Sequence, residues 1–381
     1  MESPDLEQER NVWDKLERIL ANFLAGALAA LALYLFFSNT EELWSLLVAL
    51  DYDHNKADLI AIAGSAVAGL LLIVFLEWKK GRPANSEKLH YWLQAIIRYM
   101  LAYIFLVYGF AKVFHNQFYS LSSTLDMPLG EISGLELTWR FFGYSYAYTL
   151  FIASSQIIGS TLLFYRRTTT LGAVLLLPVI SNIVFVNFTH NIPVRLYSTF
   201  YLVMVLYLLS ADIKRLKALF WDNRTFGGRA FPTFSKRRLR LVIKYVVIII
   251  FFASAVGESY YAYIISQRIT TPLYGVWEVE DYQVNGDSRA ADADPSVWKK
   301  VYFESDMFVA IKASEPKPEI FISKLDSQNQ TIKLLNEKKY NPSVEGSYDF
   351  AGSYELVSGH TLITKVSNGT DTICVTLKKL R

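Results

Sequence analysis

Residues 242–284 read VIKYVVIIIFFASAVGESYYAYIISQRITTPLYGVWEVEDYQV, and they join two different kinds of sequence. The first part, residues 242–265, is a nearly unbroken apolar run, and about 20 such residues are enough for a helix to cross a bilayer. From Gly275 the pattern changes to alternating apolar and polar residues, which is typical of a half-buried β-strand. This boundary predicts a helical membrane part followed by a C-terminal β domain.

The composition of the whole chain agrees with a membrane protein. Of 381 residues, 52% are hydrophobic and 19% are charged, and the mean hydropathy is +0.23. Soluble domains carry about a quarter charged residues. The single cysteine, Cys374, excludes an intramolecular disulfide and a pair of cysteines for zinc or redox chemistry. We expect Cys374 to behave as a small buried hydrophobic residue.

Apolar segments of spanning length recur along the first two thirds of the chain. We predict seven helical spans, at residues 20–37, 59–78, 92–114, 144–165, 171–188, 194–213 and 242–265. The resulting organisation is a cytoplasmic amphipathic tail (1–19), two accessory helices (20–78), a four-helix core (92–213), a basic loop (214–241), the seventh helix (242–265) and a β domain (270–381).

The connections between these spans alternate between rich and poor in lysine and arginine. The N-terminal tail and the second, fourth and sixth connections are rich, and the sixth carries nine basic residues between 214 and 240. Basic connections stay on the cytoplasmic side. The N-terminus is therefore predicted to be cytoplasmic and the β domain extracytoplasmic (periplasmic). The aromatic residues within the basic loop favour contact with lipid headgroups, and we expect no nucleic acid as a partner.

Short β-type segments fill the C-terminal region, with turn-forming residues between them. We predict eight strands, at 275–284, 298–304, 307–313, 319–325, 331–335, 346–352, 361–366 and 372–380. Eight strands in sequence predict an up-and-down meander, and closing it into a small barrel removes its exposed edges. The opening Gly275-Val276-Trp277 resembles the start of lipocalin-like barrels. A barrel of this size either holds one small ligand or is filled by its own side chains.

Polar residues inside the predicted spans are expected to have a structural or functional role, because burying them in a bilayer is costly. In the third span, Arg98 and Lys112 lie on one helical face. Arg98 is expected to extend to the cytoplasmic surface. Two interpretations of Lys112 remain open, one in which it extends outward to the surface and one in which it binds a partner or ligand. In later spans, Gln156, Gly159 and Asn182 are expected to pack helices together.

Further polar residues gather at the outer ends of the spans. Asn187, His190 and Asn191 are spaced as i, i+3 and i+4, which predicts one shared face. Glu258 is expected to pair with a cation there. Two histidines without a pair of carboxylates make a poor metal site, so we predict no metal. A pocket for an anionic or carbonyl-bearing head with an apolar tail would consist of Lys112, His115, Arg140, Asn187, His190, Asn191 and Arg195.

The stretch RYMLAYIFLVYGFAKVF, from Arg98 to Phe114, resembles the DoxX-like family of small four-helix membrane proteins. The resemblance rests on the initial arginine, on Gly109 and Lys112 near its end, and on the basic turn of Arg166 and Arg167. It covers about residues 92–212. It implies a four-helix bundle in the bacterial cytoplasmic membrane, and some members of the family are linked to quinone-coupled redox processes. A glutamate usual in the family is Gln156 here, which weakens any proton transfer at that position.

These observations lead to one main functional expectation and two alternatives. We expect a DoxX-like protein that binds a lipophilic molecule, a quinone or a lipid, at the outer face of the membrane. One alternative is a quinone-linked oxidoreductase subunit that works with a redox partner. The other is a non-catalytic envelope protein whose β domain docks a partner protein. The sequence leaves open whether the chain catalyses a reaction, since it carries no HExxH, GxSxG, Walker or dinucleotide motif.

Overall fold

The computed structural model describes most of the chain from residue 86 onward and a few positions before it. The described residues are 25–30, 32, 64, 67, 69, 71, 86–224, 237–268, 271–290, 294–305, 307–339 and 348–380. They divide into two units, one of Met1–Val113 and Ala147–Ser259 and one of Phe114–Tyr146 and Tyr260–Arg381. The predicted tail at 1–19, most of the first two predicted spans and the middle of the basic loop lie outside the described residues.

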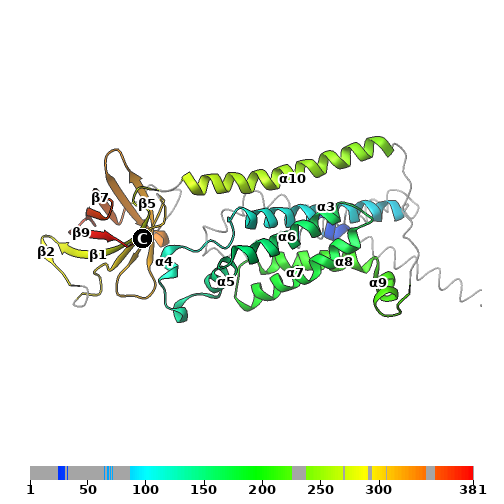
Figure 1. Ribbon diagram of the computed structural model, residues 1–381, viewed down its shortest axis with the longest axis horizontal. Coiled ribbons are helices and arrows are strands. Elements are labelled where there is room, and N and C mark those ends of the chain that lie inside the picture. Colours follow the sequence, from blue (N-terminus) through cyan, green and yellow to red (C-terminus); the bar gives the residue numbers. More distant parts are fainter. Residues whose placement is uncertain are drawn as a thin grey trace, which may run out of the picture. The chain divides into compact units, whose positions relative to one another are not determined.

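Helices dominate the first unit, and they coincide with the predicted spans from the third onward (Figure 1). Within the described residues, three helices are long and apolar enough to cross a membrane, at His90–Val113, Thr169–Thr189 and Arg238–Ser266. There is a fourth candidate span if the helices Arg195–Ser210 and Ile213–Phe220, which meet at a bend of 74°, cross the membrane as one. A helical part is thus confirmed. The helices are α3 (Ser86–Val113), α6 (Tyr146–Leu163), α7 (Thr169–Thr189), α8 (Arg195–Ser210), α9 (Ile213–Phe220) and α10 (Arg237–Arg268).

Glycines let the helices of the first unit approach closely. A Cβ atom added to Gly172 of α7 would lie 2.8 Å from the carbonyl oxygen of Gly159 in α6. A Cβ atom on Gly109 of α3 would lie 2.6 Å from Cγ1 of Ile157 in α6. Both distances are shorter than normal carbon contacts, so larger residues would push the helices apart. Small residues are the usual means of tight helix packing in membranes.

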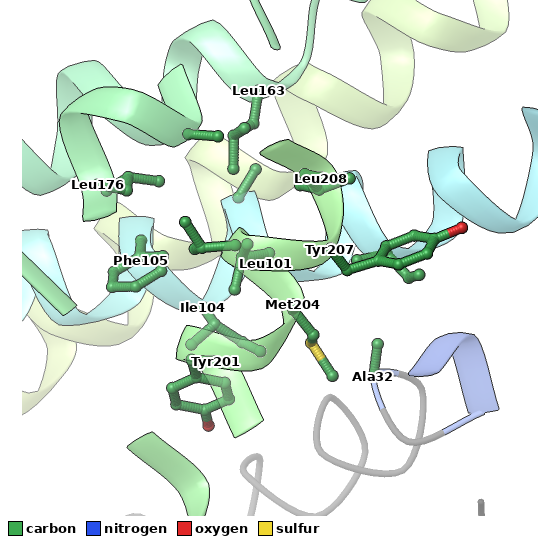
Figure 2. Packing of buried hydrophobic residues seen from close by; sticks show 14 of the residues in the cluster. Ala32, Leu101, Ile104, Phe105, Leu163, Leu176, Tyr201, Met204, Tyr207 and Leu208 are labelled. Carbon is green, nitrogen blue, oxygen red and sulfur yellow. The ribbon is translucent and has the colours of Figure 1, made fainter. Parts of the chain in front are cut away.

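The core of the first unit draws side chains from several helices (Figure 2). Leu101 and Phe105 of α3 lie in it together with Leu176 of α7, and all three are fully buried. In Figure 2, Met204 of α8 extends toward Ala32, which belongs to the first predicted span. These residues come from separate helices, and no single helix can bury its own apolar face. The core therefore forms only when the helices pack together.

The second unit contains an antiparallel β-barrel, as predicted. From β3 onward each strand pairs with the next in the chain, while β1 pairs with both β2 and β3. β1 also pairs with β9 to close the barrel, with registers from Trp277↔Lys379 to Val284↔Ile373. The eight-stranded meander is therefore confirmed. The strands are β1 (Gly275–Val284), β2 (Asp287–Ser288), β3 (Lys300–Phe303), β4 (Phe308–Lys312), β5 (Glu319–Asp326), β6 (Thr331–Asn336), β7 (Phe350–Ser358), β8 (Thr361–Ser367) and β9 (Thr372–Lys379).

Two details of the barrel differ from the prediction. The strand predicted at 346–352 begins at Phe350 and continues to Ser358 as β7. The short strand β2 was not predicted, and it extends β1 through a tight turn at Asn285 and Gly286. Both turn residues have positive φ, at 54° and 96°, as a two-residue hairpin turn requires.

Large side chains fill the interior of the barrel. Trp277, Phe303, Leu362 and Val375 are fully buried members of one hydrophobic cluster. The indole Nε1 of Trp277 donates a hydrogen bond to the carbonyl oxygen of Leu273 at 2.7 Å, so its polar atom is satisfied. This packing favours the side-chain-filled alternative over a barrel that holds a ligand. Cys374 is only half-buried, because it alternates with the core residues of β9 rather than joining them.

The connection between α3 and α6 also belongs to the second unit. It contains short helices that were not predicted. The longest of them, α5, begins with a capping box: Ser133 Oγ accepts the N–H of Glu136 at 3.2 Å, and the Glu136 carboxylate accepts the N–H of Ser133 at 2.7 Å. The short helices of this unit are α4 (Ser122–Leu125), η1 (Leu129–Glu131), α5 (Gly134–Gly143) and, between strands, η2 (Glu337–Lys339).

Candidate functional site

Lys112 lies buried near the end of α3. Its side chain is 3% exposed, so it does not extend outward to the surface of the first unit, which removes one of the two interpretations. Its Nζ donates a hydrogen bond to the carbonyl oxygen of Tyr108 at 3.2 Å and lies 5.7 Å from the centre of the Tyr108 ring. A buried ammonium is costly unless polar groups surround it. The polar groups nearby therefore define the candidate site.

These polar groups lie on three helices, α3, α7 and α8, and hydrogen bonds link them in pairs. The hydroxyl groups of Tyr108 in α3 and Tyr201 in α8 share a hydrogen bond. Ser198 lies one turn before Tyr201, and its hydroxyl accepts a hydrogen bond from Nδ2 of Asn187 in α7 at 3.0 Å. We call these five residues the buried polar chain: Lys112, Tyr108, Tyr201, Ser198 and Asn187.

The sequence predicts only two members of this buried polar chain as site residues, Lys112 and Asn187. A signal for the others was present, because Ser198 and Tyr201 are three residues apart and so share one face of α8. Asn187 is 5% exposed, and its amide would be unpaired without the Ser198 hydroxyl. The pairing of these two residues therefore links α7 to α8 at this level.

The shared face predicted for Asn187, His190 and Asn191 does not form. α7 ends at Thr189, and Asn191 has a positive φ of 55°, so the chain leaves the helical path before the next turn. Asn191 is exposed, whereas Asn187 is buried. His190 Nδ1 lies 3.0 Å from Thr189 Oγ1 and 3.3 Å from the carbonyl oxygen of Val186. His190 therefore makes hydrogen bonds within the end of its own helix.

The remaining predicted ligand residues lie outside the buried polar chain. Arg195 is the first residue of α8 and is half-buried. His115 belongs to the second unit, is exposed, and stacks on Tyr146 with 3.9 Å between the ring centres. Arg140 also belongs to the second unit, in α5, and its Nε and Nη2 are buried without a hydrogen-bond partner among the described residues. The seven predicted residues are thus divided between the two units.

The three residues predicted to pack helices have different environments. Gly159 lies at the close contact between α6 and α7 described above. Gln156 is 1% exposed, and its side-chain oxygen has no hydrogen-bond partner in the described part of the chain. Asn182 is exposed on α7, unlike the other two. The orphaned amide oxygen of Gln156 adds a second unusual polar group to the helical core.

Among the residues that the structure describes, Glu258 pairs with hydroxyl groups and not with the cation that was expected. Its carboxylate accepts hydrogen bonds from the Tyr103 hydroxyl and the Ser254 hydroxyl, both at 2.8 Å. These contacts tie α10 to α3 within the first unit. Among the described residues, no group of three or more histidine, cysteine, aspartate or glutamate side chains is arranged to hold a metal ion.

The second unit has a polar site of its own, where the connection after α3 meets the barrel wall. The Glu304 carboxylate accepts the backbone N–H groups of Ser122 and Ser123 at 3.0 and 2.7 Å. The Asp126 carboxylate accepts from Lys300 Nζ at 2.9 Å and from the Tyr302 hydroxyl at 3.1 Å. The sequence does not predict this site, because no local pattern links residues that lie 181 and 182 positions apart.

Comparisons with known proteins found one informative relative. The chain is 40% identical over 128 residues to YwoB of Bacillus subtilis, an uncharacterized protein. The matched part covers 34% of this chain and 82% of YwoB. No family model matches the sequence, and no solved structure matches it.

Proposed function

This chain belongs to the YwoB family, and we propose that it is a multi-pass protein of the bacterial cytoplasmic membrane that binds a lipophilic molecule. In this proposal seven helices cross the membrane, the core of residues 92–212 is DoxX-like, and the barrel lies on the extracytoplasmic side. The described positions of the first two predicted spans are helical. A Cβ atom on Gly69 would lie 2.5 Å from the carbonyl oxygen of Gly26, which supports two closely packed helices there.

The observation that carries the proposal is the buried polar chain from Lys112 to Asn187. Lys112 lies in the last turn of α3 and is nevertheless buried. Ionisable residues within membrane helices are costly to bury, and such residues usually mark a functional site. Here the ammonium, two tyrosine hydroxyls and an amide offer donors to a carbonyl or anionic head. The surrounding helices carry apolar side chains that suit a tail. A quinone or a lipid combines both features.

The proposal depends on fewer residues than the seven that the sequence predicted as ligand contacts. Lys112 and Asn187 remain as the expected contacts of the head group, and Tyr201 joins them. Gln156 is a further candidate, because its buried amide oxygen would gain a partner from a ligand that carries a hydroxyl group. His115, Arg140, His190, Asn191 and Arg195 are no longer required.

Native mass spectrometry of gently purified protein tests the proposal, with extraction and identification of bound quinones and lipids. We expect one defined lipophilic molecule per chain. Replacing Lys112 with methionine or Asn187 with leucine should weaken its retention about tenfold, since each removes a hydrogen bond of the buried chain. Asn182→Leu is the matched control, because it makes the same change at an exposed position of α7. Unchanged retention in both site variants would contradict the proposal.

A second candidate function concerns the barrel. Its interior is occupied by its own side chains, which favours a structural or docking role over ligand storage. We propose that Val357 near the end of β7, which is 57% exposed, faces a partner protein of the envelope. A photoactivatable residue placed at Val357 should cross-link one specific protein in intact membranes. Equal cross-linking from exposed Glu278 on β1 would show that the contact is not specific.

The redox alternative stays a proposal that rests on the DoxX-like resemblance alone. If the chain is a subunit of a quinone-linked oxidoreductase, a redox partner should co-purify with it in stoichiometric amount. Bound quinone without such a partner would favour simple binding.

A further inference from the structure

The short helix α9 leaves the end of α8 at a sharp angle. It begins at Ile213, three residues after α8 ends at Ser210, and the two helices meet at a bend of 74° (Figure 1). Asp212 lies at this bend. Its carboxylate accepts a hydrogen bond from the Thr170 hydroxyl at 2.5 Å and pairs with Arg215 at 3.2 Å. The bend is therefore tied to the first turn of α7, within the same structural unit.

A second polar contact holds the beginning of α7 in place. Arg98 of α3 donates a hydrogen bond from its Nη1 to Thr169 Oγ1 at 3.3 Å. Its side chain is 8% exposed, so the expected extension of Arg98 to the cytoplasmic surface is wrong. The residue to which Asp212 is bonded thus follows directly after one that is bonded to α3. The direction of α9 is set by the helical bundle and not by a free joint.

This direction decides how α9 lies relative to a membrane that α8 crosses. α8 has 16 residues and is about 24 Å long, which is close to the hydrocarbon thickness of about 30 Å. The eight residues of α9 form about 12 Å of helix, but at 74° to α8 they add only about 3 Å along its axis. If α8 crosses the membrane as proposed, α9 lies close to the plane of the membrane surface.

The apolar side chains of α9 suit such a position. Four of them form an arc along one side of the helix, because they recur three or four positions apart: Ile213, Leu216, Leu219 and Phe220. Leu216, in the middle of this arc, packs against the hydrophobic core of the first unit, so the arc faces the helical bundle. The other three side chains are exposed within the described part of the chain, and Phe220 is 73% exposed. An uncovered apolar arc of this kind is typical of a helix that lies in the membrane interface.

Basic residues occupy the other side of α9. Lys214 and Lys217 are exposed and lie three positions apart, so they share one face. Their ammonium groups reach the headgroup level when the apolar arc is inserted, because lysine side chains extend from apolar surroundings toward water. The exposed indole of Trp221 follows directly after the helix, and tryptophan rings commonly lie at this level. The positive charge favours anionic headgroups, which accumulate against basic residues on the cytoplasmic side.

We propose that α9 is an in-plane anchor in the cytoplasmic leaflet of the membrane. Ile213, Leu219 and Phe220 insert among the acyl chains. Lys214 and Lys217 bind the phosphate groups of anionic phospholipids. The chain allows only about 10 Å between the end of α8 and the start of α9, so a soluble partner would have to displace lipid to reach the apolar arc. This inference rests on the membrane placement proposed above, but it shares no residue with the buried polar chain.

Lipid-quenching fluorescence of the full chain in nanodiscs tests the placement of α9. An environment-sensitive fluorophore is attached to the cysteine of Phe220→Cys or Lys214→Cys in a Cys374→Ser background, and the lipids carry bromine on their acyl chains. We expect strong quenching of the label at position 220 and weak quenching at position 214, on the other side of the same helix. Leu206→Cys, at an exposed position of α8, reports whether α8 itself crosses the membrane.

Native mass spectrometry tests the preference for anionic lipid, with nanodiscs that contain equal amounts of phosphatidylcholine and phosphatidylglycerol. We expect phosphatidylglycerol to be retained preferentially, and its apparent affinity to fall about fivefold in Lys214→Gln and in Lys217→Gln. Lys324→Gln is the matched control, because it removes an exposed lysine of the barrel. All three lysines are exposed, and circular dichroism checks that each variant keeps its fold.

Several results would overturn this inference. A label at position 220 that is unquenched while the Leu206→Cys label is quenched would remove α9 from the bilayer, and two unquenched labels would remove the membrane placement as well. Protection of the position 220 label from aqueous iodide without quenching by lipid would identify a protein as the occupant. An affinity for phosphatidylglycerol that is unchanged in both lysine variants, or equally reduced in Lys324→Gln, would exclude the phosphate contacts.

Lys112→Met separates this inference from the proposed binding function. We expect it to leave both the quenching at position 220 and the affinity for phosphatidylglycerol unchanged, whatever it does to the lipophilic molecule of the buried polar chain. A loss of phosphatidylglycerol affinity in Lys112→Met equal to that in Lys217→Gln would contradict an independent site at α9.

Discussion

The Glu304 carboxylate accepts the backbone N–H of Ser123 at 2.7 Å across 181 residues of sequence. The same carboxylate also holds the N–H of Ser122, and Glu304 is 8% exposed. A carboxylate that is buried at this level needs such donors. The pair therefore anchors the connection between α3 and α6 to the wall of the barrel, within one structural unit.

Removing this anchor should destabilise the second unit. We expect Glu304→Ala to lower its free energy of unfolding by about 2–4 kcal/mol, because two buried N–H groups lose a charged acceptor. Denaturant unfolding followed by the fluorescence of Trp277 and Trp298 measures this change. Glu280→Ala is the control, since Glu280 only forms an exposed ion pair with Lys378. Equal effects of the two substitutions would contradict the anchoring role.

Close helix packing in the first unit should depend on Gly172. We expect Gly172→Ala to destabilise the helical unit by about 1–3 kcal/mol, because the new methyl group would lie 2.8 Å from the carbonyl oxygen of Gly159. Gly257→Ala in α10 is the matched control, since nothing lies within 4 Å of its added Cβ. Thermal unfolding of the detergent-solubilised protein, followed by size-exclusion chromatography, compares the two. If Gly172→Ala unfolded at the same temperature as Gly257→Ala, the close α6–α7 contact would be contradicted.

Acid should weaken the barrel through Asp294. Hydrogen bonds from the Ser296 hydroxyl and N–H, and then from Arg289, lower the pKa of Asp294 from its ordinary value of 3.8 to about 2. A depressed pKa contributes stability above the unfolded-state value, and that contribution is lost as the pH falls through the folded-state value. We therefore expect the unfolding midpoint to fall between about pH 4 and pH 2. In Asp294→Asn the fall of the unfolding midpoint over this pH range should be smaller. If the midpoint of this variant depended on pH as in the unchanged protein, the role of Asp294 would be contradicted.

The predicted topology can be tested with reporter fusions in a bacterial host. We expect alkaline phosphatase fused at the C-terminus to be active, because the β domain is predicted to be extracytoplasmic. Green fluorescent protein at the same place should remain dark. Both results should reverse for fusions placed within the basic loop at 214–241. An inactive phosphatase at the C-terminus would mean an even number of spans.

The strands and helices were largely predictable because their signals are local. The alternation that begins at Gly275 predicted β1 with its observed bounds, and the length of the apolar run at 242–265 predicted α10. The candidate site was less predictable. Asn187 and Asn191 are one turn apart by spacing, but the helix ends at Thr189, so only Asn187 turns inward. Where a helix ends depends on the turn that follows and on the partner available to each side chain.

The sequence by itself determined the order and type of the elements, since apolar length and periodicity act through the nearest residues along the chain. It also determined where the membrane-type segments stop and the β domain starts. Only the tertiary structure decided that β1 pairs with β9 and that Asn187 meets Ser198. These contacts join residues far apart in the chain, and they form only when whole elements pack, because each buried polar or charged group must then find a partner that no local pattern specifies.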